Sequence, residues 1–521
     1  MTDQSPQEKA QAYLKTSALY KLGHLPTEQQ NPKTMNLSDL SRTDPLRAIH
    51  ILQEIDLDAL SALHRRSNQV ERLRLVIRDT LLGGGRIYLC GCGATGRLSL
   101  SLESFWRETR EGTDLVDRVV SFMAGGDIAL VRAAENFEDY SDYGSRHLTE
   151  LGFKDGDLLL AITEGGETPY VIGAALAAKD ISEIPPWFLY CNPDSALVGS
   201  IERSRQVIED SGIEKLNLET GPMAISGSTR LQASTVLMYA VGLALLEFES
   251  EEKIADQIAK FIEQVQQADL EFLVPFIEHE SKYYTEGHGI YYQTDVYEIT
   301  VLTDTTERHP TFSLQPFENS HEPDAQPSLS YLYLPHARNT EDGWFQTLKR
   351  KPRALDWEGY GDRLGLKKLY GYDFSVASVE RRKNKFKENH FFKIDREGLL
   401  MRFRLDDIRG TIPIHRMSIL EEHLMLKMCI NILSCLVMGR MGRIEGNVMS
   451  WVKPSNGKLI DRTIRYVQML YEAKYSETKQ GVDNHKKKPT PTYESICDKL
   501  FIALETFKGD ESIVMKVLSQ C

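Results

Sequence analysis

GGGRIYLCGCGATGRL, residues 83–98, joins a glycine break, a short apolar run and a glycine-rich turn. The triple glycine ends a helical pattern, RIYLC predicts a buried strand, and the turn leads into a helical pattern that continues through Trp106. Three more strand-like runs, at residues 118–126, 157–163 and 186–193, alternate with helical patterns. Strands that alternate with helices are typical of a parallel sheet covered on both faces. We therefore predict an α/β fold with a doubly wound parallel sheet.

A second α/β unit follows a charged amphipathic segment at residues 251–280, which predicts a linker helix. An apolar helical pattern at residues 423–439 closes this unit, which has fewer glycine-rich loops than the first. Its candidate strands are residues 289–293, 328–335, 369–376 and 399–405. We expect a leader at 1–55, a first domain at 56–245, a linker at 246–280, a degenerate second domain at 281–455 and a helical C-terminal cap at 456–521.

The composition excludes several classes of protein. The chain has 521 residues, 41% hydrophobic and 26% charged, with a net charge of -13 and a pI of about 5.6. An acidic chain lacks the basic footprint of a general nucleic-acid binder, and we expect the basic run at residues 485–492 to be a solvated loop. We find no apolar run that predicts a membrane span and no signal peptide in the polar first residues.

The seven cysteines form no framework of regular spacing, and an odd number indicates reduced thiols in the cytoplasm. Cys90 and Cys92 lack the second pair of ligands that a zinc site needs. We therefore expect small core residues at these positions, and neither a metal nor a cofactor in the protein.

Three strand-to-helix corners are rich in glycine and hydroxyl side chains, at residues 91–96, 161–169 and 226–230. Ligands of open α/β sheets bind outside the carboxyl ends of the strands, so these corners predict a site with donors for phosphate and sugar oxygens. Serine and threonine also cap helices, which would explain any one corner alone. The first corner fits G-x-G-x-x-G, but the acidic residue that a dinucleotide site places after the next strand is absent, which counts against NAD.

Five stretches resemble, in order, the sugar isomerase (SIS) domain family, and specifically its group of N-acetylmuramic acid 6-phosphate etherases and glucokinase regulatory protein. The stretches are residues 83–98, 124–139, 161–174, 191–197 and 221–234. The leader TEQQNPKTMNLSDLS also resembles this group, and the similarity spans most of residues 25–245.

The two-domain arrangement resembles the glucokinase regulatory protein, because residues 293–312 look like the start of its second SIS domain. Residues 421–449 and the SNGKL motif look like the closing helices of that domain. The resemblance implies two tandem SIS domains that satisfy each other, and hence a monomer with an internal pseudo-dimer.

The resemblance also implies which residues contact the ligand. Glu138 matches a glutamate that contacts the sugar, and it is our one catalytic candidate. Lys427 matches a lysine that reaches across from the second domain, while its first-domain counterpart is Met238, which implies one complete cleft. Glu167 stands where the regulatory protein has serine, and its charge would repel a phosphate. The remaining predicted ligand-binding residues are Gly93, Ala94, Thr95, Thr163, Glu164, Gly165, Ser228 and Thr229.

The etherase reaction needs a base and an acid, for which paired carboxylates are the usual means. The resemblance places one etherase glutamate at the position of Phe105, and Glu103 lies about 200° around the helix from it. We therefore favour a sensor or regulator of carbohydrate metabolism that binds a hexose 6-phosphate such as fructose 6-phosphate. The alternative is a sugar-phosphate lyase or isomerase, such as an etherase-like enzyme, using Glu138 with Glu103 or Glu167. A sugar kinase is the protein partner that the resemblance suggests.

Overall fold

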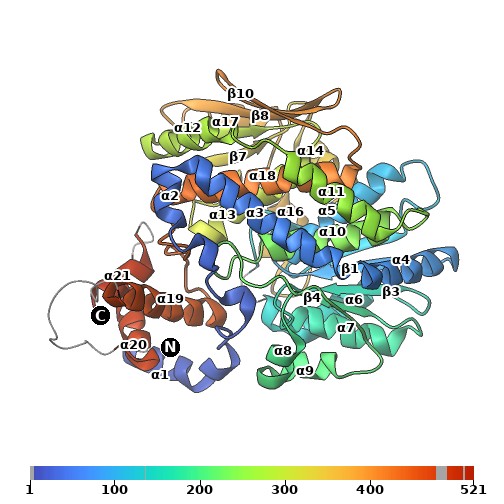
Figure 1. Cartoon of the computed structure of the whole chain (residues 1–521), viewed down its shortest axis with the longest axis horizontal. Helices are drawn as coiled ribbons and strands as arrows, with labels where there is room; N and C mark the ends of the chain where they lie inside the picture. Colours follow the sequence, from blue (N-terminus) through green and yellow to red (C-terminus); the bar gives the residue numbers. More distant parts are fainter. Residues whose placement is uncertain (1–4, 135–136, 477–489, 508–510) are drawn as a thin grey trace.

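The computed structural model describes residues 5–134, 137–476, 490–507 and 511–521. Two five-stranded sheets are separated by a layer of helices that includes α3, α10, α11 and α18 (Figure 1). The first sheet and its helices use residues from the N-terminal half, and the second sheet uses residues from 289 onward. Of the basic run at residues 485–492, residues 485–489 lie outside the described part of the chain.

Sheet A is fully parallel, as the alternating pattern predicts, with the strand order β2-β1-β3-β4-β5. Its central strands are buried on both faces, which explains their continuous apolar sequence. The sequence pattern missed β5, of whose four residues three are polar and only Leu216 is buried. The strands are β1 (Ile87–Gly91), β2 (Val119–Met123), β3 (Leu158–Ile162), β4 (Trp187–Tyr190) and β5 (Glu214–Asn217).

The helices around sheet A follow the expected order. The loop after β1 leads into α5, and the loop after β3 leads into α7, whose first residue is a proline. Both loops therefore lie at the carboxyl edge of the sheet. The helices are α4 (Ser67–Leu82), α5 (Ala94–Thr109), α6 (Ser141–Glu150), α7 (Pro169–Ile181), α8 (Asp194–Ser200), α9 (Glu202–Ile208) and α10 (Gln232–Leu246), with the 3-10 turns η4 (Asp127–Leu130) and η5 (Phe137–Asp139).

Sheet B is mixed, whereas we expected a second parallel sheet. Its order is β10-β9-β8-β6-β7, and only β6 pairs in parallel with β7 and β8, while β8, β9 and β10 form an antiparallel meander. Alternating exposed and buried residues in this meander show that one of its faces lies open to solvent. The strands are β6 (Gly289–Gln293), β7 (Ser330–Tyr333), β8 (Asn389–Glu397), β9 (Leu400–Leu405) and β10 (Ile408–Pro413).

Two further predictions for this half are wrong. Residues 369–376 form no strand, because they turn between two helices, and Tyr372 and Phe374 are buried as core residues of that turn. The linker is not one helix, because residues 268–272 break it into two. The helices of this half are α11 (Ile254–Gln267), α12 (Leu273–Glu286), α13 (Glu298–Phe312), α14 (Thr340–Leu348), α15 (Gly361–Leu364), α16 (Leu366–Leu369), α17 (Val376–Arg382) and α18 (Ile419–Arg440).

The helix α18 is long and apolar enough to cross a membrane, although we expected no such run. However, 94% of its apolar window is buried inside the protein, where it packs against α10, α12 and α13. It begins at a capping box formed by Ser418 and Glu421. Because helices from both halves of the chain pack around α18, it is a core helix that the two halves share.

The two ends of the chain lie together at one side of the molecule (Figure 1). Helix α1 packs on α20, where Tyr13 and Tyr493 share a hydrogen bond of 3.0 Å between their hydroxyl oxygens. The expected leader is thus an integral part of the fold, and Glu28 within it is buried against α19. The elements are α1 (Pro6–Thr16), η1 (Ser17–Leu19), η2 (Pro26–Glu28), η3 (Pro32–Thr34), α2 (Leu37–Thr43), α3 (Pro45–His64), α19 (Gly457–Ser476), α20 (Tyr493–Glu505) and α21 (Ile513–Ser519).

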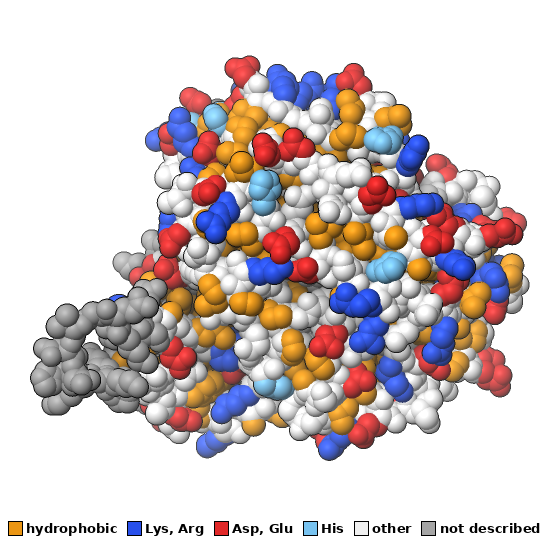
Figure 2. Space-filling view, in the orientation of Figure 1, with side chains coloured by type: hydrophobic (Ala, Val, Ile, Leu, Met, Phe, Trp, Pro, Cys, Tyr) orange, Lys and Arg blue, Asp and Glu red, His pale blue; other side chains and the backbone are white. Residues whose placement is uncertain are grey.

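The face shown in Figure 2 carries acidic and basic side chains interspersed with one another. No broad basic area covers this face, which agrees with the acidic composition.

Candidate functional site

In the corner after β1, the side chain of Thr95 forms hydrogen bonds within the turn itself. Gly93 has φ of 55°, a left-handed conformation that favours glycine, and Ala94 begins α5 directly after it. The hydroxyl of Thr95 accepts a hydrogen bond from the Cys92 backbone N–H and donates one to the Cys92 carbonyl, both 2.9 Å long. The predicted hydroxyl donor of Thr95 is therefore already used within the turn.

The corner after β3 contains a carboxyl group with a raised pKa. Glu164 is buried, and its Oε1 accepts a hydrogen bond of 2.9 Å from the hydroxyl of Ser234 on α10. Burial in an apolar environment raises the pKa of Glu164 to about 7. The hydroxyl oxygens of Thr163 and Thr168 lie 3.0 Å apart at the two ends of the same loop, which passes through Gly165. A carboxyl group with this pKa can either donate or accept a proton near neutral pH.

Glu167, in the same loop, carries a fully compensated negative charge. Its Oε1 lies 2.7 Å from the Lys458 ammonium group of α19, and its Oε2 lies 2.6 Å from the Arg203 guanidinium group of α9. Burial alone would raise the pKa of Glu167, but the two cations outweigh it and hold the pKa at about 2. The repulsion that we expected from this carboxylate is therefore largely neutralised by its neighbours.

An outer hollow of about 140 Å³ opens beside this ion-paired cluster. Glu138 lines it from η5, and its Oε2 accepts a hydrogen bond of 3.2 Å from the Cys92 thiol, while its Oε1 lies 3.4 Å from Nδ2 of Asn456. The side chain of Glu138 thus bridges the first corner and the beginning of α19. The residues around the hollow are Leu19, Tyr20, Leu22, Glu138, Asp139, Glu167, Thr168, Pro169, Arg203 and Lys458.

Sequence reasoning missed the two basic residues of the outer hollow. Lys458 belongs to the SNGKL motif, which we recognised by resemblance without assigning a role to its lysine. The strongest available signal was a lysine directly after a glycine at a helix start. Arg203 carried no signal, because only the packing of α9 against α7 directs it to this corner.

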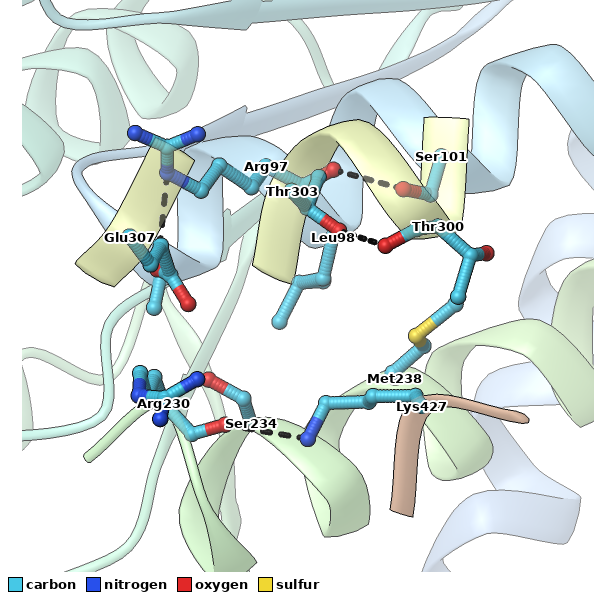
Figure 3. A pocket seen from close by; sticks show the side chains of 11 residues that line it. Arg97, Leu98, Ser101, Arg230, Ser234, Met238, Thr300, Thr303, Glu307 and Lys427 are labelled. Carbon is cyan, nitrogen blue, oxygen red and sulfur yellow. Dashed lines mark hydrogen bonds and ion pairs between the residues drawn. The ribbon is translucent and has the colours of Figure 1, made fainter. Parts of the chain in front are cut away.

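A separate inner hollow of about 30 Å³, room for about two water molecules, lies between the two halves. In Figure 3, Arg97 and Glu307 form an ion pair on one side, and Lys427 extends toward the backbone of Arg230 on the other. The residues around it are Ala94, Arg97, Leu98, Ser101, Arg230, Ser234, Met238, Thr300, Thr303, Glu307 and Lys427.

Lys427 crosses from α18 to the first half of the chain, as we expected of a lysine that reaches across. Its Nζ donates to the carbonyls of Arg230 and Leu231 and to the side-chain oxygens of Thr235 and Asn431, at 2.8–3.3 Å. Burial lowers its pKa to about 8. Protein oxygens thus occupy its three N–H donors, and the structure places Lys427 and Glu138 in different hollows.

The third corner is covered by other parts of the chain. The backbone N–H of Gly227 donates to the Thr27 carbonyl, and Tyr466 of α19 donates to the carbonyl of Ser226. Among the described residues, the buried hydroxyl of Ser228 has no hydrogen-bond partner. The carbonyl of Thr229 accepts from the Ser234 N–H. Ser228 thus has a donor available, whereas Thr229 supports the start of α10.

Neither position 103 nor position 105 of the helix α5 carries a free carboxylate. Glu103 is 1% exposed and contacts Arg350 at 3.0 Å and Arg353 at 2.8 Å. Burial would raise the pKa of Glu103, but these two arginines outweigh it and keep the pKa far below the ordinary value. Phe105 is buried against His423 of α18, with ring centroids 4.3 Å apart. Glu103 therefore joins the two halves and cannot supply a proton at neutral pH.

Comparison with known proteins links the chain to one family. A family model described as the glucokinase regulatory protein N-terminal SIS domain matches residues 68–179. N-acetylmuramic acid 6-phosphate etherases from Rippkaea orientalis and Geobacillus thermodenitrificans are each 32% identical to this chain. The matches cover 42% and 41% of this chain, respectively, and 67% of each relative. The solved structure of tagatose-6-phosphate ketose/aldose isomerase from Escherichia coli aligns over 75% of this chain and 93% of its own, at 12% identity and a TM-score of 0.44.

The etherase similarity and the domain match agree with the parallel sheet A and its three glycine-rich corners. The chain belongs to the SIS family, in the group related to the N-acetylmuramic acid 6-phosphate etherases and the glucokinase regulatory protein.

Proposed function

We propose that this protein binds a phosphorylated sugar in the outer hollow and acts as a sensor or regulator of carbohydrate metabolism. The observation that carries the proposal is the convergence of Lys458 and Arg203 at the hollow that Glu138 also lines. Two cations suit a phosphate group, and a carboxylate suits the hydroxyl groups of a sugar. The N-terminus of α7, which begins at Pro169, adds its helix dipole on the side of the phosphate.

In this proposal Glu167 occupies the anion position while no ligand is bound. A sugar phosphate would take over contacts to Lys458 and Arg203, so binding and the displacement of the Glu167 carboxylate are coupled. Because α19 and α9 belong to different parts of the chain, this exchange would alter the contact between them. That coupling is a physical route from ligand binding to a changed surface, which a regulator needs.

The absence of a proton-exchanging carboxylate on α5 supports a binding role over etherase turnover. Phe105 fills the position at which the resemblance implies a glutamate, and Glu103 is held ionised between two arginines. The ligand in this proposal is a hexose 6-phosphate such as fructose 6-phosphate, and the regulated partner is a sugar kinase or another enzyme of sugar metabolism. We propose that the protein works in the cytoplasm as a monomer.

A thermal-shift screen with hexose 6-phosphates and the matched free sugars tests the binding proposal. A ligand at a hundred times its dissociation constant should add about 2.7 kcal/mol to the free energy of unfolding. We expect a shift with a phosphate ester only, which is lost in Lys458→Ala and retained in Lys260→Ala, a surface lysine paired with Glu252. A shift that persists in Lys458→Ala, or no shift with any ester, would contradict the proposal.

Glu167→Gln tests the exchange of anions directly. The amide removes the competing charge and frees both cations, so we expect the dissociation constant of the sugar phosphate to fall about tenfold or more. Isothermal titration calorimetry of both proteins at pH 7 measures this change. Unchanged or weaker binding in Glu167→Gln would show that Glu167 and the ligand do not compete.

A second candidate function is a lyase or isomerase acting on a sugar phosphate. It is favoured by the pKa of about 7 for Glu164 and by the names of the etherase relatives. In this alternative Glu164 exchanges the proton, and Glu138 acts as the second carboxylate. Release of lactate from N-acetylmuramic acid 6-phosphate, lost in Glu164→Gln and in Glu138→Gln, would establish it and overturn the purely regulatory role. Turnover that is unchanged in both variants would exclude this pair of residues.

A further inference from the structure

Two histidines and a glutamate meet at the amino ends of β6 and β8 in sheet B. His288 directly precedes β6, and Glu388 and His390 lie at the beginning of β8. One ligand atom from each of the three residues lies within 4.8 Å of the other two. We propose that His288, Glu388 and His390 bind a divalent transition-metal ion, with Zn²⁺ as the best match to two imidazoles and a carboxylate.

The distances between the ligand atoms suit a tetrahedral ion. Nδ1 of His288 and Nε2 of His390 are 3.1 Å apart. Oε2 of Glu388 lies 3.9 Å from the first nitrogen and 3.8 Å from the second. Bonds of about 2.0–2.1 Å in tetrahedral geometry place ligand atoms about 3.3 Å apart. The carboxylate needs to move by roughly half an ångström to meet that geometry, and its side chain is 65% exposed and able to do so.

A supporting set of contacts orients the second histidine. Nδ1 of His390 lies 3.0 Å from Oδ2 of Asp406, and the hydroxyl of Tyr283 donates to the same oxygen at 2.7 Å. The rings of Tyr283 and His390 are stacked, 3.7 Å apart and 4° from parallel. A carboxylate that accepts from one imidazole nitrogen leaves the lone pair of the other nitrogen available, an arrangement typical of metal-binding histidines. Asp406 therefore acts as a positioning residue for the ligand atom Nε2.

The imidazoles are well shielded, with side chains only 13% and 11% exposed for His288 and His390. The two facing nitrogens, Nδ1 of His288 and Nε2 of His390, are within hydrogen-bonding distance of each other. With a metal ion, both lone pairs are used and the exposed Glu388 balances charge, leaving a fourth position for water. The site would fasten the turn before β6 to the β8–β10 meander, at the edge of sheet B where the parallel strands begin.

This site is independent of the sugar-phosphate proposal and departs from our expectation of no metal. The sequence offered no motif, because His288 and His390 are 102 residues apart. Only the parallel pairing of β6 with β8 brings Gly289 next to Asn389, and with them the neighbouring ligands.

Metal binding by the full chain, first stripped with a chelator, tests the proposal. Zn²⁺ titration against a chromophoric chelator should show one tight site, and Co²⁺ should give the visible absorption of a tetrahedral ion. We expect His390→Ala and Glu388→Gln to lower Zn²⁺ affinity by a hundredfold or more, and Asp406→Asn to lower it by about 10–100-fold. His336→Ala, which removes an exposed histidine paired with Asp295, should change nothing.

Two results would overturn the inference. One is the absence of stoichiometric Zn²⁺ binding, which would leave a histidine pair joined by a hydrogen bond only. The other is binding that Glu388→Gln leaves unchanged, or that His336→Ala weakens as much as His390→Ala does, which would show adventitious surface binding. Because Glu388 is exposed, its variant keeps the test valid even if His390→Ala fails to fold.

Discussion

Glu164 and Glu167 lie three residues apart in one loop, and both are buried, yet their pKa values move in opposite directions. The folded-state pKa of Glu164, about 7, lies above the ordinary value of 4.5, so the folded protein holds this proton more tightly than the unfolded chain. Its contribution to stability is fully present below pH 4.5 and is lost as the pH rises to about 7. The folded-state and ordinary pKa values differ by about 2.5. Because a difference of one in pKa corresponds to about 1.36 kcal/mol, the contribution to the free energy of unfolding is about 3 kcal/mol.

We therefore expect Glu164→Gln to match the wild-type stability at pH 4.5 and to exceed it by about 3 kcal/mol at pH 8. The amide oxygen can still accept from Ser234, so the variant removes only the cost of the buried charge. Urea unfolding followed by circular dichroism, repeated from pH 4.5 to 8, measures the difference.

Glu167→Gln is the matched control. The pKa of Glu167, about 2, lies below the ordinary value, so this carboxylate changes the stability with pH in the opposite direction to Glu164. The ion pairs of Glu167 add stability that is present above pH 4.5 and lost as the pH falls toward 2. We expect this variant to be less stable than the wild type by about 3 kcal/mol at pH 8. If Glu164→Gln gains no stability between pH 4.5 and 8, Glu164 is not a buried carboxyl with a raised pKa. The second candidate function would then lose its proton donor.

Two further predictions concern α5 and the first corner. Glu103→Gln should cost about 3 kcal/mol in urea unfolding, because it leaves the charge of Arg353 without its buried partner and leaves Arg350 with Asp127 alone; a loss below about 1 kcal/mol would show that solvent reaches this cluster. Burial and the neighbouring carboxylate raise the pKa of the Cys92 thiol, so iodoacetamide at pH 8 should label Cys521 in the folded protein and spare Cys92. Rapid labelling of Cys92, read by mass spectrometry, would contradict the raised pKa of its thiol.

Local patterns identified four of the five strands of sheet A and missed the polar strand β5. Continuous apolar runs such as residues 158–162 form strands because both faces of a parallel sheet are covered, and the glycines of the corners mark the turns into helices. They failed in the second half, where residues 369–376 are apolar because they pack in a core turn. Periodicity alone does not separate that environment from a buried strand.

The features of the candidate site likewise fall into those that local sequence predicts and those that depend on tertiary packing. The sequence by itself determined the corners that contain Thr163 and Ser228, and the family to which they belong, because these depend on residues close together in the chain. Only the tertiary structure decided that Lys458 and Arg203 neutralise Glu167, and that Lys427 lies in a different hollow from Glu138. The same holds for the meeting of His288 with His390. Charge interactions and metal coordination act over a few ångströms in space, and residues far apart in sequence reach that distance only when the chain is packed.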